Sequence, residues 1–321
     1  AHTKAVEQAC QFRPSGTSAA VFVLAKDTGI LRELFSKMGV RVYYLAREKD
    51  GVAVQIERLR TLAVDSGIGI LVWVSLPLWC SYAFGRRIAE RQVFWSQRFH
   101  PIITPNIDLY LCPGKRTETV RNWHGQDWTV VHTPLCLELE GGVTSKKANQ
   151  HGFKPCYGTV GREEKIAIPS YLDAVGEVLK ATGGGFCWTG RKSLPSIVDS
   201  LKNYPNEFVG WVDPVSYISS LDVYLETFPL GGLSSQVAWN QGIPVVAFDN
   251  WHSTYGSIEF EGLARATNAR EYVDLAVRLA TDEAYRKSVI EAQYAALEGE
   301  KTQAPADIQK WWELVKERVT A

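Results

Sequence analysis

The stretch Glu-Thr-Phe-Pro-Leu-Gly-Gly-Leu-Ser-Ser, residues 226–235, carries most of the information about the fold of this chain. It follows a short apolar run typical of a buried strand, and a helix-length segment begins at Ser234. The adjacent Gly231 and Gly232 let backbone amides approach a ligand closely. Ser234 and Ser235 can cap the helix, whose first N–H groups can hold a diphosphate. The stretch therefore predicts a strand–loop–helix unit with an anion site, although ordinary helices of α/β proteins also begin with this pattern.

Short apolar runs alternate with amphipathic stretches of helix length along the whole chain, which is the pattern of parallel α/β units. The 321 residues suffice for two domains of roughly 150 residues each. Residues 137–150 contain Glu-Gly-Gly and Ser-Lys-Lys with little apolar periodicity, and they predict a linker. We therefore expect a Rossmann-like domain over residues 1–140, a second one over 151–303, and a last helix, 304–321, that returns to the first domain.

The apolar pattern also predicts the individual elements. The expected strands are residues 19–25, 40–45, 69–74, 92–96, 107–112, 128–132, 156–160, 185–189, 207–209, 223–226 and 244–248. The expected helices are residues 28–38, 52–65, 83–90, 169–181, 194–201, 214–220, 234–241, 269–280, 283–298 and 306–319. The last helix begins after Pro305 and carries Trp311 and Trp312, which need an apolar surface to pack against.

Composition excludes several classes of protein. Lys+Arg and Asp+Glu both number 35, so the net charge is zero, which argues against a nucleic-acid partner unless Arg86, Arg87, Arg91 and Arg98 form one basic stripe. No apolar run reaches the ~18 residues of a membrane span, and the N-terminus lacks an apolar signal-peptide core. The six cysteines form no Cys-x-x-Cys pair. We expect neither a zinc site nor a disulfide framework, but buried, reduced thiols in a cytoplasmic protein.

Other polar segments follow expected strands of the second half. Residues 158–166 contain Arg162 and Lys165, and the lysine ammonium could neutralise a leaving diphosphate. Thr189 and Gly190 end the next strand and could line a nucleotide pocket. The alternatives, a solvated charged loop and a plain turn, remain open.

Two histidines lie in comparable loops. His100 follows an expected strand of the first half, where it could orient a phosphate or a sugar hydroxyl or transfer a proton. His252 follows the expected strand 244–248 and is a candidate ligand contact together with Tyr255. A single histidine is more often a structural residue, and that alternative also stays open.

In this order the segments resemble the glycosyltransferase family of the eukaryotic O-GlcNAc transferase and the bacterial cytoplasmic protein N-glucosyltransferases. The run 221–232 is similar to the family's Leu-Asp-x-x-Leu-Asp-Thr-Phe-Pro-x-Gly-Gly, with Glu226 in place of the second Asp. Further similar segments are His100–Thr104 ahead of Ile107–Tyr110, Gly161–Lys165 ahead of Pro169, and Gly242–Val246.

The resemblance implies a GT-B fold, in which two Rossmann-like domains with parallel sheets face each other across a cleft. It also implies a UDP-sugar donor, inversion at the anomeric carbon, and catalysis without a metal or other cofactor. The acceptor could be a protein side chain. The catalytic candidates are His100 and Lys165, with Lys165 on the donor diphosphate. The donor-binding candidates are Arg162, Thr189, Gly190, Tyr217, Gly231, Gly232, Ser234, Ser235, Gln236 and His252.

The sequence departs from the family's pattern after the glycines. The family has an acidic residue there, whereas Gln236 can hydrogen-bond a ribose but cannot act as a general base. The base stays open among His100, Glu259 and a first-domain carboxylate such as Asp27. Two alternative functions also remain, a UDP-sugar epimerase-like enzyme of the same fold and a non-catalytic nucleotide-sugar binding module or partner subunit.

Overall fold

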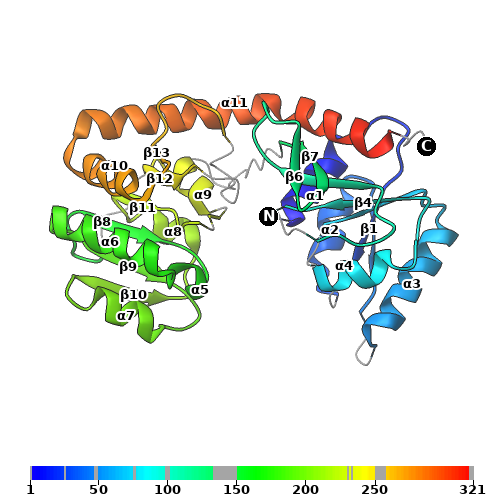
Figure 1. Ribbon diagram of the computed structural model, residues 1–321, viewed down its shortest axis with the longest axis horizontal. Helices are drawn as coiled ribbons and strands as arrows, with labels where there is room; N and C mark the ends of the chain where they lie inside the picture. The colour runs from blue at the N-terminus through cyan, green and yellow to red at the C-terminus, as the bar shows by residue number, and fades with distance from the viewer. Residues whose placement is uncertain are drawn as a thin grey trace. The chain divides into compact units, whose positions relative to one another are not determined.

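The computed structural model describes residues 2–24, 27–46, 50–74, 77–97, 102–132, 150–229, 231–232, 234–249 and 258–317. The chain divides into two compact units (Figure 1). Unit 1 comprises Ala1–Leu135 and Gln303–Ala321, and unit 2 comprises Cys136–Thr302. Apart from residue 150, the expected linker 137–150 lies outside the described residues.

Unit 2 is built on a six-stranded sheet in which every strand pairing is parallel. The strand order is β10-β9-β8-β11-β12-β13. Numbered within the unit, this is the order 3-2-1-4-5-6 of a Rossmann sheet. The strands are β8 (Cys156–Thr159), β9 (Gly185–Thr189), β10 (Asn206–Gly210), β11 (Val223–Leu225), β12 (Val245–Phe248) and β13 (Arg265–Ala266).

Helices cover both faces of this sheet because its strands are apolar on both sides. Tyr157 and Phe186 belong to a core with side chains of α6, α7 and α10, whereas their neighbours Cys156 and Cys187 belong to a second core with α8, α9 and part of α11. The helices are α5 (Glu163–Ile166), α6 (Pro169–Thr182), α7 (Pro195–Leu201), α8 (Pro214–Ile218), α9 (Ser234–Asn240), α10 (Ala269–Thr281) and α11 (Glu283–Lys316).

Local sequence explains where several of these helices begin. Pro169, Pro195 and Pro214 occupy the first turn, where the N–H that proline lacks has no helical partner. Asp213 and Asn268 cap α8 and α10 by accepting a hydrogen bond from a backbone amide of the first turn, at 2.8 and 2.9 Å.

Unit 1 contains two sheets, β1-β2 and β3-β4-β5-β7-β6. All pairings are parallel except the β6–β7 hairpin. The strands are β1 (Ala20–Val23), β2 (Arg41–Tyr44), β3 (Ile70–Trp73), β4 (Arg91–Trp95), β5 (Leu109–Pro113), β6 (Val120–Trp123) and β7 (Gln126–Val131). The helices are α1 (His2–Gln11), α2 (Ile30–Ser36), α3 (Val52–Asp65) and α4 (Pro77–Phe84).

The two sheets of unit 1 are separated at β1 and β3, which would be neighbours in a continuous doubly wound sheet of the order 2-1-3-4-5. An apolar cavity of about 720 Å³ lies between them, lined by Val21 and Val23 of β1, Leu71 of β3, and Trp95 and Trp311. No strand pairing joins β1 to β3 among the described residues. Apolar side chains thus line a gap between β1 and β3. In a continuous sheet, backbone hydrogen bonds between these two strands would take its place.

The helix α11 runs without interruption through Pro305, so the expectation of two helices separated before residue 306 was wrong. Proline removes one backbone hydrogen bond, but packing holds the helix on both sides of it. Ala296 and Leu297 are buried in the second core of unit 2. In unit 1, the rings of Trp311 and Trp95 lie 4.7 Å apart, and Arg116 pairs with Asp307 at 2.7 Å.

Other expected elements differ from the structure. The helix expected at 83–90 lies instead at Pro77–Phe84, because Pro77 suits a first turn and the backbone turns at Arg87, whose φ is 38°. The helices α1 and α5 and the strands β6 and β13 were not expected. The helix α5 and the strands β6 and β13 are too short for a clear apolar pattern, whereas α1 is amphipathic and its pattern was missed.

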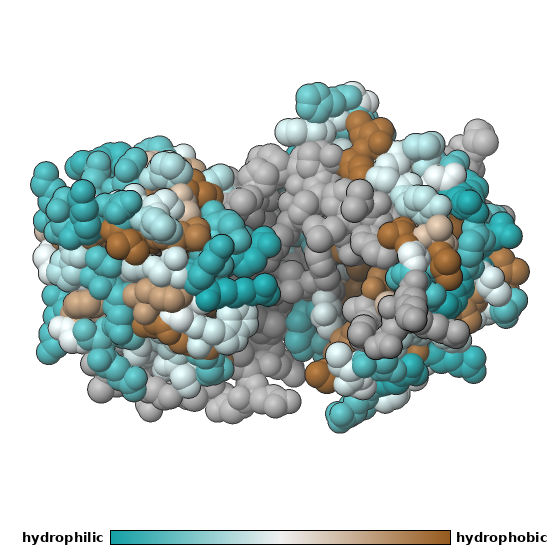
Figure 2. Space-filling view, turned by 90° about the horizontal axis from the view of Figure 1, so that it is seen from below, coloured by the Kyte–Doolittle hydropathy of each residue, from teal (hydrophilic) through white to brown (hydrophobic). Residues whose placement is uncertain are grey.

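The described cysteines Cys10, Cys112, Cys156 and Cys187 are buried and form no disulfide. Among the described residues, no helix combines the length and apolar character that a membrane span needs. On the face drawn in Figure 2, hydrophobic residues lie scattered among mostly hydrophilic or neutral ones.

We expect Trp311→Ala to lower the free energy of unfolding of unit 1 by about 3–5 kcal/mol, because it empties a buried position against Trp95. Urea denaturation followed by circular dichroism measures the loss. The matched control is Trp211→Ala, since Trp211 is 81% exposed, and its change should stay within about 0.5 kcal/mol. Equal stability of the two variants would contradict the packing described for α11.

Candidate functional site

Loops from neighbouring strands meet at the carboxyl end of the unit 2 sheet. The strand order reverses between β8 and β11, and ligands of open α/β sheets bind at such a switch point. The loop after β8 leads into α5 and Lys165, and the loop after β11 contains Gly231 and Gly232. The switch point therefore lies between the two segments that the sequence singles out most strongly.

Lys165 joins these two loops. Its side chain is buried, with 9% of the residue exposed, and its Nζ donates a hydrogen bond to the carbonyl oxygen of Gly231 at 2.6 Å. A buried ammonium is costly unless hydrogen-bond acceptors surround it. The backbone carbonyl of the glycine loop supplies one acceptor, and it holds the positive charge at the start of α9.

Glu226 holds the glycine loop through hydrogen bonds. Its carboxylate is buried, and Oε1 accepts hydrogen bonds from Ser235 Oγ at 2.8 Å and from the amide of Gly232 at 3.2 Å. A Cβ on Gly231 would lie 2.5 Å from the same oxygen. Glycine at 231 is therefore required by the close approach of a buried carboxylate.

The loop after β9 is tied to the loop after β8 by two hydrogen bonds. The amide of Gly161 donates to Thr189 Oγ1 at 3.2 Å, and the amide of Arg191 donates to Glu163 Oε2 at 3.2 Å. Hydrogen bonds from the amides of Glu163 itself and of Arg191 lower the pKa of the Glu163 carboxyl. An ionised Glu163 thus fixes the position of α5, on which Lys165 stands.

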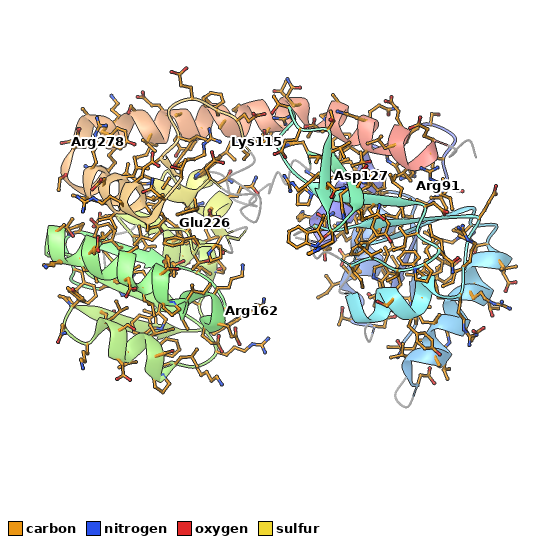
Figure 3. All side chains as sticks on the ribbon, viewed as in Figure 1. Arg91, Lys115, Asp127, Arg162, Glu226 and Arg278 are labelled. Atoms are coloured by element: carbon orange, nitrogen blue, oxygen red, sulfur yellow. The ribbon has the colours of Figure 1, made fainter. Side chains whose placement is uncertain are left out.

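Arg162 and Glu226 contrast in position. Figure 3 shows Arg162 at the periphery of unit 2 beside α5, and Glu226 in the interior. Arg162 is exposed, so its guanidinium can reach a ligand in solvent. Burial raises the pKa of Tyr224 to about 12. Its hydroxyl donates to the carbonyl oxygen of Val160 and accepts from the amide of Val160, both at 3.3 Å. The neutral Tyr224 therefore supports the start of the loop after β8.

The structure brings most of the predicted donor-binding residues of unit 2 to this end of the sheet. Several of their polar groups already have partners within the protein: the Ser235 hydroxyl and the Gly232 amide bond to Glu226, the Thr189 hydroxyl accepts from Gly161, and the amide of Gly190 donates to Gly210. Gln236 is 3% exposed. These residues build the loops, and Lys165 and Arg162 provide the positive charge.

Tyr217 does not belong to this group. It is buried in the second core, and its hydroxyl donates to the carbonyl oxygen of Cys187 at 2.8 Å. That bond occupies the only polar group of the side chain, so Tyr217 is a structural residue. The predicted His100 and His252, together with Tyr255, lie outside the described residues.

The two described candidates for a general base are exposed carboxylates, Asp27 in unit 1 and Glu259 in unit 2. Asp27 accepts from the Gly29 amide at 2.8 Å and pairs with Arg32 at 2.7 Å. These interactions lower the pKa of Asp27. A carboxylate stabilised in this way is a weak base, which argues against Asp27.

Sequence reasoning missed the supporting roles of Glu163, Tyr224 and Glu226. Tyr224 lies within the buried strand β11, and Glu226 directly follows that strand, ahead of the glycine loop. A charged residue in that place rarely stays buried without partners, and this signal could have identified it. Nothing in the local sequence indicates that Glu163 reaches the loop after β9.

Comparisons with known proteins agree on the fold. No protein-family model matches the chain, and no curated protein matches its sequence. Among solved structures, an O-GlcNAc transferase mutant of Thermobaculum terrenum superposes with a TM-score of 0.74 at 20% identity, covering 97% of this chain. This chain has the GT-B fold. It spans 64% of the Thermobaculum protein.

Two further solved structures match over nearly their whole length. HepE of Anabaena, in complex with UDP-glucose, has a TM-score of 0.62 at 10% identity, with 97% of this chain and 96% of HepE covered. A Listeria monocytogenes protein described as a UDP-N-acetylglucosamine 2-epimerase has a TM-score of 0.55 at 12% identity, with 100% and 96% covered. At these identities the likeness shows the fold alone.

We expect Gly231→Ala to destabilise unit 2 by about 1–3 kcal/mol, because the new methyl group would overlap the buried Glu226 carboxylate. Thermal unfolding of the purified variant measures the loss. Gly299→Ala is the control, since Gly299 lies within α11 and a methyl group added there would meet no neighbouring side chain within 4 Å. Alanine at this helical position should stabilise by about 0.5–1 kcal/mol. A Gly231→Ala protein as stable as the wild type would refute the account of the glycine loop.

Proposed function

We propose that this chain is a glycosyltransferase that binds the diphosphate of a UDP-sugar at the switch point of unit 2. The observation that carries the proposal is the hydrogen bond between Lys165 Nζ and the Gly231 carbonyl. It holds an ammonium beside a glycine loop at the carboxyl edge of a Rossmann sheet, where nucleotides bind in this fold. Several structural neighbours are described by name with UDP-glucose, UDP or UDP-N-acetylglucosamine, which supports the choice of donor.

The reaction we infer is an inverting displacement that needs no metal ion. A nucleophile of the acceptor attacks the anomeric carbon, and the bond from that carbon to the diphosphate oxygen breaks. UDP leaves with the electron pair, and the acceptor's proton passes to a general base. Lys165 and the exposed Arg162 would stabilise the charge that develops on the diphosphate, which is the largest electrostatic demand of the step.

A protein side chain is the acceptor we favour. Two observations support it: the motif resemblance of residues 221–232 to protein glycosyltransferases, and the structural likeness to an O-GlcNAc transferase. The free thiols of the described cysteines fit a cytoplasmic enzyme of the bacterial type that these motifs resemble.

Replacing the ammonium of Lys165 tests the proposal. Lys165→Met keeps the aliphatic stem and removes the charge, so the fold should persist while UDP affinity and sugar transfer fall by about 10²–10³-fold. Isothermal titration with UDP and release of UDP from UDP-sugars measure the two effects. Lys180→Met is the matched control, because Lys180 is exposed in the last turn of α6. Unchanged UDP affinity in a folded Lys165→Met protein would overturn the assignment.

A UDP-sugar epimerase is the second candidate, favoured by the likeness to the Listeria protein. Incubation with UDP-N-acetylglucosamine and no acceptor distinguishes the two functions. An epimerase would convert it to an isomeric UDP-sugar, whereas the transferase would leave the sugar's configuration unchanged apart from slow hydrolysis. Tight UDP binding without isomerisation, hydrolysis or transfer to any acceptor would instead indicate a non-catalytic binding module.

A further inference from the structure

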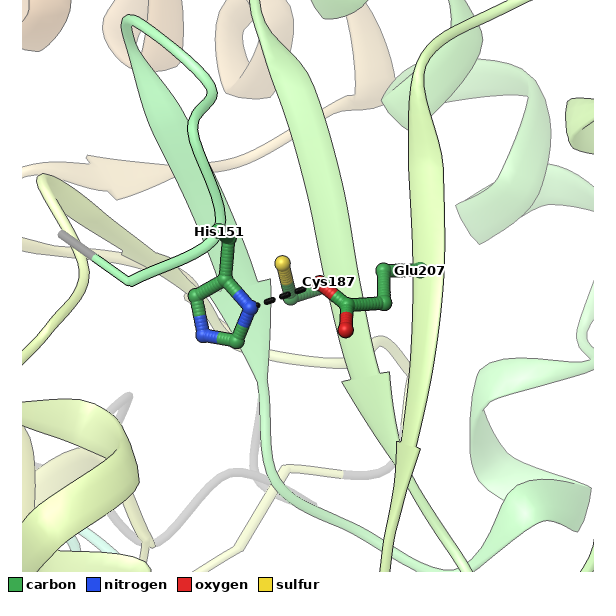
Figure 4. A group of neighbouring side chains, drawn as sticks. All are labelled: His151, Cys187 and Glu207. Carbon is green, nitrogen blue, oxygen red and sulfur yellow. Dashed lines mark hydrogen bonds and ion pairs between the residues drawn. The ribbon is translucent and has the colours of Figure 1, made fainter.

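A second cluster of reactive side chains lies away from the proposed donor site. His151 precedes β8, Cys187 is the central residue of β9, and Glu207 stands near the start of β10 (Figure 4). Each residue offers one atom that can bind a metal: a ring nitrogen of His151, the sulfur of Cys187 and a carboxylate oxygen of Glu207. These three atoms lie within 4.8 Å of one another. Because Lys165 and the glycine loop follow the carboxyl ends of their strands, the cluster belongs to a different part of the sheet.

The sheet register builds this cluster. Glu207 and Cys187 are direct partners across the parallel pair β10–β9, so their side chains project from the same face. His151 reaches the same place from the segment ahead of β8, and its Nδ1 lies 2.7 Å from Glu207 Oε2. The three residues are separated by 36 and 20 positions in the sequence, and only the fold unites them.

We propose that His151, Cys187 and Glu207 bind one Zn²⁺ ion. Imidazole, thiolate and carboxylate are the three ligand types that zinc takes in proteins, at about 2.0–2.3 Å. Ligand atoms around a tetrahedral zinc lie roughly 3.3–3.8 Å apart at those bond lengths. The three atoms, now within 4.8 Å of one another, reach this spacing by small side-chain rotations. The distance between His151 Nδ1 and Glu207 Oε2 would increase from 2.7 Å, and the Cys187 sulfur would move closer to both.

The choice of zinc follows from the ligands and their charges. Calcium and magnesium prefer sites made of oxygen atoms, whereas a buried sulfur and an imidazole favour zinc among the common cellular ions. A thiolate and a carboxylate together carry two negative charges, which a divalent cation neutralises. Glu207 has a side chain that is 47% exposed, so the ion has an entry path and a place for a water molecule in the fourth position.

Surrounding groups match those found around metal ligands. Ser220 Oγ lies 3.5 Å from His151 Nε2, so the nitrogen that does not face Glu207 has a polar neighbour. The Cys156 sulfur lies 3.9 Å from the Cys187 sulfur and can donate to it once Cys187 is a thiolate. Contact with Cys156 and burial raise the pKa of the Cys187 thiol, so zinc must displace that proton to solvent as it binds.

The alternative is an ion pair between His151 and Glu207 that merely adjoins a cysteine. Such a pair contributes little stability, because the Glu207 side chain is half exposed to solvent. It also gives no reason for the Cys187 sulfur to lie beside it. A zinc ion would instead join the segment ahead of β8 to the edge strand β10 and the neighbouring β9. The ion would therefore cross-link three segments of unit 2 and stabilise its fold. This structural role does not depend on diphosphate binding at Lys165.

The test measures zinc on the full chain without an affinity tag. After treatment with a chelator and dialysis under reducing conditions, competition with a chromogenic chelator should give one tight equivalent of Zn²⁺. Cobalt substitution should produce a sulfur-to-cobalt charge-transfer band. Cys187→Ser should abolish that band and weaken zinc binding at least tenfold, and Glu207→Gln should weaken it similarly.

Glu207→Gln is the variant that should stay folded if Cys187→Ser does not, because it alters a half-exposed side chain without changing its size. The matched controls are Cys112→Ser and His124→Ala in unit 1, which should leave both the stoichiometry and the affinity unchanged. Absence of a tight equivalent in the wild type, or zinc binding that survives Cys187→Ser unaltered, would overturn the proposal. UDP binding should be the same in the Glu207→Gln variant, so failure of this site and failure of the donor site are distinguishable.

Discussion

The buried ammonium of Lys165 is the constraint on which the proposed donor site depends. A charge in that place must find oxygen acceptors, and the fold supplies the Gly231 carbonyl at 2.6 Å. This bond connects the loop after β8 to the loop after β11. The two loops flank the point where the strand order reverses, so the bond that stabilises the lysine also joins the two sides of the proposed site.

Carboxylates hold this arrangement in place. Glu226 binds the glycine loop from the end of β11, and Glu163 binds the loop after β9 from α5. Both are buried, and both accept hydrogen bonds from backbone amides of neighbouring loops. The site therefore consists of preformed loops that two acidic side chains stabilise. Lys165 and Arg162 supply the positive charge for binding a ligand. A preformed site loses little conformational entropy when it binds.

The Rossmann sheet of unit 2 carries two separate groups of polar side chains. Loops and a cation follow the carboxyl ends of its strands, whereas a histidine ahead of β8, a thiol in the middle of β9 and a carboxylate near the start of β10 meet elsewhere on the sheet. Unit 1 shares the α/β pattern but divides its strands into two sheets around an apolar cavity. The carboxyl-terminal part of α11 closes one wall of that cavity with Trp311, which is why this segment groups with unit 1.

The sequence by itself determined the α/β class, most strands and helices of unit 2, and the GT-B fold that its motifs imply, because apolar periodicity and glycine loops are local signals. It also pointed to Lys165 and the glycines. Only the tertiary structure decided that α11 continues through Pro305, that Tyr217 is a core residue, and that β1 and β3 separate. It alone revealed the partners of Glu226 and Glu163 and the meeting of His151, Cys187 and Glu207. These features depend on contacts between residues far apart in the chain, which no local pattern encodes.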